Sequence, residues 1–148
     1  MSGTEIIFRE RLTPRPYVYL VVVALIAMIS IAYGVPFGAP VGWLVFIGAS
    51  ILALWALLAT SPIIEVTPTH LRAGTACIER RHVTSVQPLD PASFHLVRGR
   101  NADPRRYSLM RAWHSGSGVV IAIEDARDPH PAWILTTARP ERLAAALA

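Results

Sequence analysis

From Pro16 to Ile64 the chain reads PYVYLVVVALIAMISIAYGVPFGAPVGWLVFIGASILALWALLATSPII. These 49 consecutive residues contain no Asp, Glu, Lys, Arg or His, whereas the flanking segments have ordinary polarity. A soluble helix normally carries a polar face, so a pair of buried core helices is the weaker interpretation. The stretch instead predicts a segment that lies in a lipid bilayer.

The apolar stretch divides at Gly34-Val-Pro-Phe-Gly-Ala-Pro40, where two glycines and two prolines predict a turn. The predicted helices are 17–33 and 41–59, and nineteen residues extend roughly 28 Å, close to the thickness of a bilayer core. Residues 17–59 are therefore predicted to form a two-helix transmembrane hairpin with its turn at 34–40. Gly48 and Ser50 are small residues that favour close helix approach, with Gly42 and Ala49 nearby. Neither predicted span contains an Asp, Glu, Lys, Arg or His, which argues against an ion channel or a transporter.

The arginines predict the orientation of this hairpin. Arginines precede the first helix and follow the second, and the turn carries no charge: Arg9, Arg11, Arg15, Arg72, Arg80, Arg81. By the positive-inside rule both termini are expected in the cytoplasm, in a multi-pass protein of the cell inner (plasma) membrane. Residues 1–16 then form a cytoplasmic N-terminal segment. A cleaved signal peptide is the alternative, but a second apolar segment follows the first at once.

Residues 60–148 are predicted to form a small, basic cytoplasmic domain. Short β-branched runs alternate with turn residues, which predicts strands at 63–67, 70–73, 75–78, 83–86, 107–113, 119–124 and 132–137. We expect hairpin turns at Gly74 and at 115–118. Asp90-Pro91 introduces a helical turn within 89–98, and Pro140 begins a final helix that ends at Leu147. The predicted fold class is thus a transmembrane hairpin followed by a β-rich α+β domain with a short C-terminal helix.

Three segments resemble one known family: Phe8-Arg-Glu-Arg-Leu12, Val66-Thr-Pro-Thr-His-Leu-Arg-Ala-Gly74, and Trp133 to Leu147. The chain is similar over nearly its whole length to an actinobacterial family known as domain of unknown function, number 3093. This resemblance implies a two-helix membrane protein without an assigned activity. The V-T-x-x-x-L-x-x-G pattern that begins at Val66, together with the final strand and helix, also resembles bacterial pleckstrin-homology-type domains.

No residue pattern predicts a metal site, a cofactor or a catalytic site. The five histidines lack the i, i+4 spacing of a helical zinc pair, and Cys77 is the only cysteine. Ser115 and Ser117 flank a glycine beside His114, where they are expected to serve turn geometry, and there is no nucleophile elbow. Cys77 is expected to be buried. No cofactor, metal ligand or catalytic residue is therefore assigned.

The most suggestive charged residues lie in a single loop: Arg98, Arg100, Arg105 and Arg106. Beside a membrane, such a loop is suited to anionic headgroups, because each basic residue contributes about 1 kcal/mol near the surface. A protein partner is a further possibility, and the alternative to any binding role is a solvated loop paired with Asp90 or Asp103. Nucleic acid is disfavoured because the segment shows no recognition helix and no aromatic platform.

The sequence therefore favours a non-enzymatic, membrane-anchored binding or scaffold module, in contact with the bilayer through its helices. The alternative is a membrane-associated enzyme whose site lies in the cytoplasmic domain. A deep polar pocket with converging Arg, His and acidic side chains would distinguish the two.

Overall fold

A computed structural model describes residues 5–148. The chain divides into two compact units. One is a helical hairpin formed by residues 13–61, and the other is β-rich and combines residues 5–12 with residues 62–148. Residues 5–12 of the predicted N-terminal segment 1–16 thus belong to the same unit as residues 62–148, and residues 1–4 lie outside the described residues.

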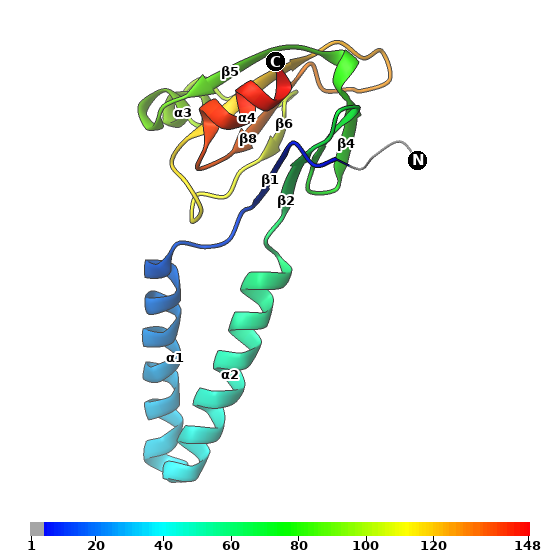
Figure 1. The fold of residues 1–148 in the computed structure, drawn as a ribbon. Helices are drawn as coiled ribbons and strands as arrows, with labels where there is room; N and C mark the ends of the chain where they lie inside the picture. The colour runs from blue at the N-terminus through cyan, green and yellow to red at the C-terminus, as the bar shows by residue number, and fades with distance from the viewer. Residues whose placement is uncertain (1–4) are drawn as a thin grey trace. The chain divides into compact units, whose positions relative to one another are not determined.

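Two helices make up the hairpin, α1 (Pro16–Phe37) and α2 (Ala39–Ala59), which lie side by side in Figure 1. The predicted turn at 34–40 is wrong in length, because both helices continue into it and only Gly38 lies between them. Gly38 has a φ of +97°, which favours glycine. Pro40 lies in the first turn of α2, where the missing N–H costs little, and Pro36 lies inside the last turn of α1, which ends at Phe37.

The two helices pack most closely through two glycines near this turn. A Cβ atom added to Gly42 would lie 3.0 Å from the Ser30 carbonyl oxygen and 3.1 Å from the Gly34 Cα. A Cβ added to Gly48 would meet no atom within 4 Å, so the prediction that Gly48 mediates close approach is wrong. The Ser30 hydroxyl donates to the Ile26 carbonyl at 2.7 Å, which satisfies it within its own helix.

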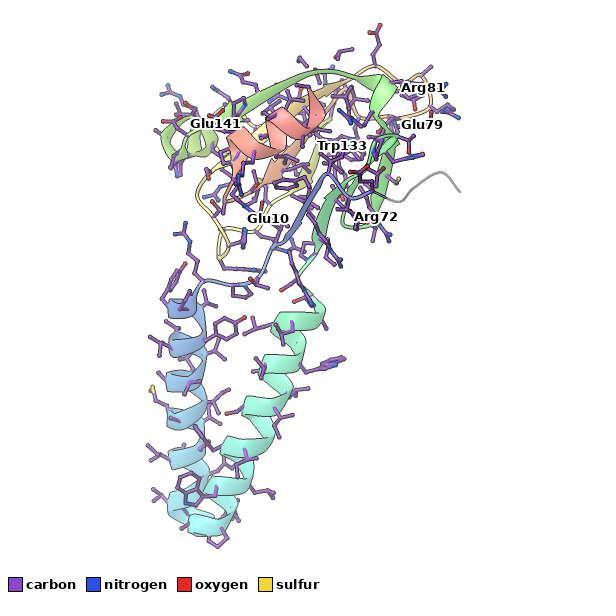
Figure 2. The ribbon with its side chains drawn as sticks, in the orientation of Figure 1. Glu10, Arg72, Glu79, Arg81, Trp133 and Glu141 are labelled. Atoms are coloured by element: carbon purple, nitrogen blue, oxygen red, sulfur yellow. The ribbon has the colours of Figure 1, made fainter. Side chains whose placement is uncertain are left out.

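Most side chains of both helices point outward, as Figure 2 shows. The apolar windows have mean hydropathies of 2.5 and 2.3, and only 11% and 6% of their residues are buried. Both helices are therefore long and apolar enough to cross a membrane, and their apolar surface is not used to form a protein core.

The first sheet of the β-rich unit has four antiparallel strands in the order of the chain: β1 (Phe8–Arg11), β2 (Ile63–Val66), β3 (His70–Ala73) and β4 (Ala76–Glu79). Strands β2, β3 and β4 confirm the strands predicted at 63–67, 70–73 and 75–78 to within one residue at each end. Strand β1 was not predicted, and it pairs with β2 so that Arg11 lies opposite Ile63. Gly74, with a φ of +63°, forms the expected turn between β3 and β4.

The second sheet has the order β5-β7-β8-β6, with β5 (Val83–Leu89), β6 (Tyr107–Leu109), β7 (Gly118–Ile123) and β8 (Ala132–Thr136). Strand β5 follows a 3-10 turn, η1 (Arg80–His82), and continues through Pro88, which its place at the sheet edge permits. The predicted hairpin at 115–118 is wrong. Strand β6 is shorter than expected and pairs in parallel with β8 rather than with β7.

Two short helices cover the second sheet, and Figure 1 shows α4 (Pro140–Leu147) lying across it. Leu143 and Leu147 of α4 are buried among the inner residues of both sheets. Helix α3 (Pro91–Arg98) begins at Asp90, which caps the Ser93 N–H at 3.1 Å. Phe94 of α3 packs on Leu89 and Ile134 and covers the opposite face. The predicted C-terminal helix and the helical turn within 89–98 are confirmed.

Candidate functional site

The β-rich unit buries one carboxylate in its interior, that of Glu10 on β1. Alternation along β1 turns Phe8 and Glu10 inward, and Glu10 pairs with the fully buried Ile64. The side chain of Glu10 is only 4% exposed. A carboxylate in such surroundings needs several hydrogen-bond donors to remain charged.

Three donors surround this carboxylate, and they come from segments more than 100 residues away. Glu10 Oε1 lies 2.7 Å from His114 Nε2 and accepts the Ala138 N–H at 2.9 Å. Glu10 Oε2 accepts from the Thr137 hydroxyl at 2.5 Å. The carboxylate thus joins β1, the loop after β6 and the chain between β8 and α4.

The hydrogen bonds continue from Thr137 into the loop before β7. Ser117 donates its hydroxyl to the Thr137 carbonyl at 2.9 Å, and its Oγ lies 2.9 Å from that of Ser115. The Arg139 N–H donates to Thr137 Oγ1 at 3.0 Å. Ser115 and Ser117 therefore support turn geometry, as expected.

The environment of Glu10 keeps it ionised at neutral pH. Burial alone raises the pKa of Glu10. This rise is more than offset by the hydrogen bonds from Thr137, His114 and Ala138 and by the charge interaction with His114, which lower the pKa. The net result is a pKa below the ordinary value of 4.5. Both carboxylate oxygens are occupied by donors, so the group is suited to holding three chain segments together rather than to accepting a proton from a substrate.

The arginine loop that the sequence singled out is partly neutralised by its own aspartate. Asp103 accepts from Arg105 Nε at 3.2 Å and from Arg105 Nη2 at 3.1 Å, and Arg106 Nε lies 4.0 Å away. The hydrogen bonds from Arg105 lower the pKa of Asp103, and in turn Asp103 raises that of Arg105.

Arg98 and Arg100 differ from the other two arginines of the loop. Within residues 5–148 their guanidinium groups make no hydrogen bond or ion pair, and Arg100 is exposed. The segment between β7 and β8 also contacts this loop, because His130 Nδ1 lies 2.9 Å from the Arg105 carbonyl oxygen. Asp103 thus engages Arg105 and Arg106. The prediction that all four arginines lie in one loop is wrong for Arg98, which ends helix α3, and Arg98 and Arg100 are the two of the four without a partner among residues 5–148.

In residues 5–148 no three His, Cys, Asp or Glu side chains are grouped to hold a metal ion. His82 Nδ1 lies 3.1 Å from the Glu124 carbonyl oxygen, and His70 Nδ1 lies 2.8 Å from Thr69 Oγ1. Cys77 is exposed on β4, so the prediction that it is buried is wrong: it pairs with Arg72 on the outer face of the first sheet.

The hairpin contains an apolar cavity of about 470 Å³ between its two helices. It lies near the turn, and the lining residues include Ser30, Gly34, Gly42, Trp43 and Phe46.

The sequence profile of the family described as "Protein of unknown function (DUF3093)" matches residues 7–147. The chain belongs to the DUF3093 family. No curated protein and no solved structure shows significant similarity to it. The matched DUF3093 region includes β1, both helices of the hairpin and the rest of the β-rich unit.

Sequence reasoning missed the Glu10 cluster of this DUF3093 protein. The signal was present in Phe8-Arg-Glu-Arg-Leu12, where Phe8, Glu10 and Leu12 alternate with arginines and are all buried. A strand with one acid on its apolar face indicates a buried, partnered carboxylate. The partners His114 and Thr137 lie too far along the chain for any local pattern to name them.

Proposed function

We propose that this protein is anchored in the membrane by its two helices and presents its β-rich unit at one surface as a non-enzymatic binding module. The observation that supports this most directly is the place of the hairpin in the chain. The two outward-facing apolar helices are inserted between β1 and β2, which are neighbouring strands of one sheet.

Chain length keeps the β-rich unit close to such a membrane. Four residues connect β1 to α1 and three connect α2 to β2. At about 3.5 Å per step these connections extend at most roughly 18 Å and 14 Å. A unit tethered twice through such short segments stays at the membrane surface.

The spanning role is tested by placing charge in the middle of each helix. Leu25→Arg and Leu52→Arg each put a guanidinium in the apolar window, at a cost of about 2.5–3.5 kcal/mol on insertion scales. We expect both variants to be lost from the membrane fraction, whereas Leu25→Ala and Leu52→Ala remain. Normal membrane accumulation of both arginine variants would mean that these helices do not span.

The proposed orientation places both termini in the cytoplasm and the Gly38 turn outside, at the plasma membrane. It is supported by Arg9, Arg11 and Arg15 before α1 and by the uncharged turn. In a Cys77→Ser background, Ala39→Cys is expected to react with an impermeant thiol reagent in intact cells. The parent Cys77, although exposed in the fold, is expected to react only after lysis; the opposite result reverses the topology.

The proposed contact with the membrane surface includes the arginine loop. Because Asp103 engages Arg105 and Arg106, we assign the main electrostatic contribution to Arg98 and Arg100. The full-length protein is expected to retain phosphatidylglycerol in preference to phosphatidylcholine in native mass spectrometry. Changing Arg98, Arg100, Arg105 and Arg106 to Gln should remove that preference, whereas an equal charge loss at Arg72, Arg81, Arg127 and Arg142 should not. If both quadruple variants behave alike, the loop is solvated surface and a protein partner becomes the better candidate.

The binding role is favoured over the enzyme alternative by the way the Glu10 cluster is connected. His114 and an acid do converge, but the acid is bonded to three donors that hold the fold. The resemblance of the sequence to bacterial pleckstrin-homology-type domains is a second reason to propose a binding role at a membrane.

A further inference from the structure

We propose that the 110–115 loop is a second membrane contact, with Trp113 and Arg111 in the headgroup layer of the bilayer. This inference rests on the proposed function, since it requires the hairpin to cross the membrane. It concerns a different part of the chain from the arginine loop, and it follows from which end of the β-rich unit this loop occupies.

The 110–115 loop lies at the end of the β-rich unit where the chain enters and leaves the hairpin. Arg11 at the end of β1 and Ile63 at the start of β2 are register partners, and both precede or follow the helices by a few residues. A Cβ on Gly74 would lie 3.5 Å from Leu109 Cδ1 and 3.6 Å from Pro62 Cβ. Leu109, the last residue of β6, directly precedes the loop, and it thus lies beside Pro62.

The other end of the loop is held at the same place. His114 Nε2 lies 2.7 Å from Glu10 Oε1, and Glu10 is two residues from Leu12, whose N–H donates to the Pro62 carbonyl at 2.9 Å. Both ends of the loop are therefore beside the two chain segments that continue into the helices. In a protein whose helices span the bilayer, this is the end of the unit nearest the membrane.

The side chains that the loop exposes have the chemistry of a membrane interface. Trp113 is 38% exposed, and the Arg111 Cζ lies 5.5 Å from the centroid of its ring. Indole rings prefer the headgroup region, where the ring contacts lipid and the N–H contacts water. The Arg111 Nη1 donates to the Met110 carbonyl oxygen at 3.0 Å and its Nε is buried, so Nη2 is the group that we assign to a lipid phosphate. The loop contains no Asp or Glu to oppose an anionic surface.

Hydrogen bonds hold the loop in shape before any lipid binds. The Arg111 N–H donates to Thr136 Oγ1 at 3.0 Å, and the His114 N–H donates to the Arg111 carbonyl at 2.9 Å. Trp113 is therefore presented on an ordered backbone, which lowers the entropic cost of docking. The other exposed large apolar side chains of this unit, among residues 5–12 and 62–148, are Ile6, Ile7 and Leu96, none of which lies in this loop.

The test uses the full-length protein in vesicles of phosphatidylcholine and phosphatidylglycerol at 3:1. In a Cys77→Ser background, nitroxide labels are attached to Ala112→Cys in the loop, to Ala126→Cys as an aqueous control and to Leu25→Cys in α1. Ala126 is exposed and follows β7 at its far end from Gly118. Collision with oxygen and with a water-soluble nickel chelate reports the depth of each label.

We expect the label at Ala112 to favour oxygen over the chelate several-fold more than the label at Ala126 does. Adding Trp113→Ala and Arg111→Gln should return it to the aqueous ratio while the near-ultraviolet circular dichroism of the buried Trp133 is kept. If the Ala112 label is aqueous while the Leu25 label lies in lipid, the loop contact is refuted and the spanning hairpin stands. If it is shielded from both reagents, a protein surface covers the loop and the inference also fails. An aqueous Leu25 label refutes the proposed function itself.

Discussion

At the scale of single residues, Glu10 connects parts of the chain that are far apart in sequence. Its carboxylate holds strand β1 to the His114 loop and to the Thr137–Ala138 segment. Within the first sheet, β1 is an edge strand and is hydrogen-bonded to one neighbour, β2. Glu10 adds a second attachment on the inner face, and this attachment depends on the negative charge.

Replacing Glu10 by Gln is expected to destabilise the β-rich unit by about 2 kcal/mol, since hydrogen bonds to a buried charge contribute about 1.5–3 kcal/mol. Urea unfolding in detergent micelles, followed by near-ultraviolet circular dichroism, measures the change. Glu5→Gln, which alters an exposed acid near the same strand, is the matched control. Equal stability of the Glu10 variant and the parent would show that the carboxylate does not stabilise the β-rich unit.

The same residue gives the unit a defined dependence on pH. Because folding lowers the pKa of Glu10, its stabilising effect is complete above the unfolded value of about 4.5 and is lost as the pH falls through the folded value. The parent should therefore lose stability more steeply than Glu10→Gln below about pH 4.5. The free energies of unfolding of the parent and of Glu10→Gln should therefore approach each other as the pH falls.

Gly118 is a position where any side chain would collide with the fold. A Cβ there would lie 2.3 Å from Phe94 Cε2 and 2.4 Å from the Leu135 carbonyl oxygen, and the backbone atom cannot move aside without breaking β8. Gly118→Ala should cost about 3 kcal/mol, at the upper end for overpacking. Gly116→Ala, whose Cβ would meet only Pro91 Cβ at 3.8 Å, should cost far less in the same unfolding experiment. Similar losses in both variants would contradict this account.

At the scale of elements, the helix crossing depends on Gly42 and not on Gly48. A larger side chain at Gly42 meets the backbone of α1, whereas one at Gly48 projects into open space. Gly42→Ile should weaken the hairpin by about 1–3 kcal/mol, and Gly48→Ile should not. Loss of helicity during a titration with sodium dodecyl sulfate measures this. A hairpin equally sensitive at both positions would place the contact elsewhere.

The sequence predicts those elements whose signals are local. The uncharged run gives both helices, the glycine at 74 gives the β3–β4 turn, and Asp90-Pro91 and Pro140 give the starts of α3 and α4. The prolines made the predicted turn too long. Pro40 occupies the first turn of α2, where a missing N–H is tolerated, and α1 continues past Pro36 to Phe37. Local signals thus locate elements better than they locate element boundaries.

Pairing between distant strands was beyond the sequence. Val119 and Tyr107 begin β-branched or aromatic runs separated by a Gly-Ser turn, which predicts a hairpin, but β6 pairs with β8 instead. Strand β1 was overlooked because four residues with alternating charge give a weak apolar pattern. The Glu10 cluster was overlooked for the same reason, since it exists only once β1 has joined the sheet.

At the scale of the whole molecule, the hairpin is an insertion into a continuous β-rich unit. Strands β1 and β2 are antiparallel neighbours, and the Leu12 N–H bonds to the Pro62 carbonyl at 2.9 Å. Residues 13–61 therefore leave and return at one point of the unit, as a long loop between two strands of a hairpin does. The core of the β-rich unit is made from its own residues, Phe8 and Leu12 among them.

Replacing residues 13–61 by a short Asn-Gly-containing turn is therefore expected to leave a folded, soluble β-rich unit. A turn of about two to five residues is enough to join antiparallel neighbours. The shortened chain should keep the near-ultraviolet circular dichroism of the buried Trp133 and should no longer sediment with membranes. A chain that begins at Pro62 is the matched control: it lacks Phe8 and Leu12 and leaves Ile64 and Val66 without β1, so it should aggregate or unfold. If the control folds as well as the shortened chain, β1 is dispensable. If neither folds, the β-rich unit depends on the helical hairpin for its stability.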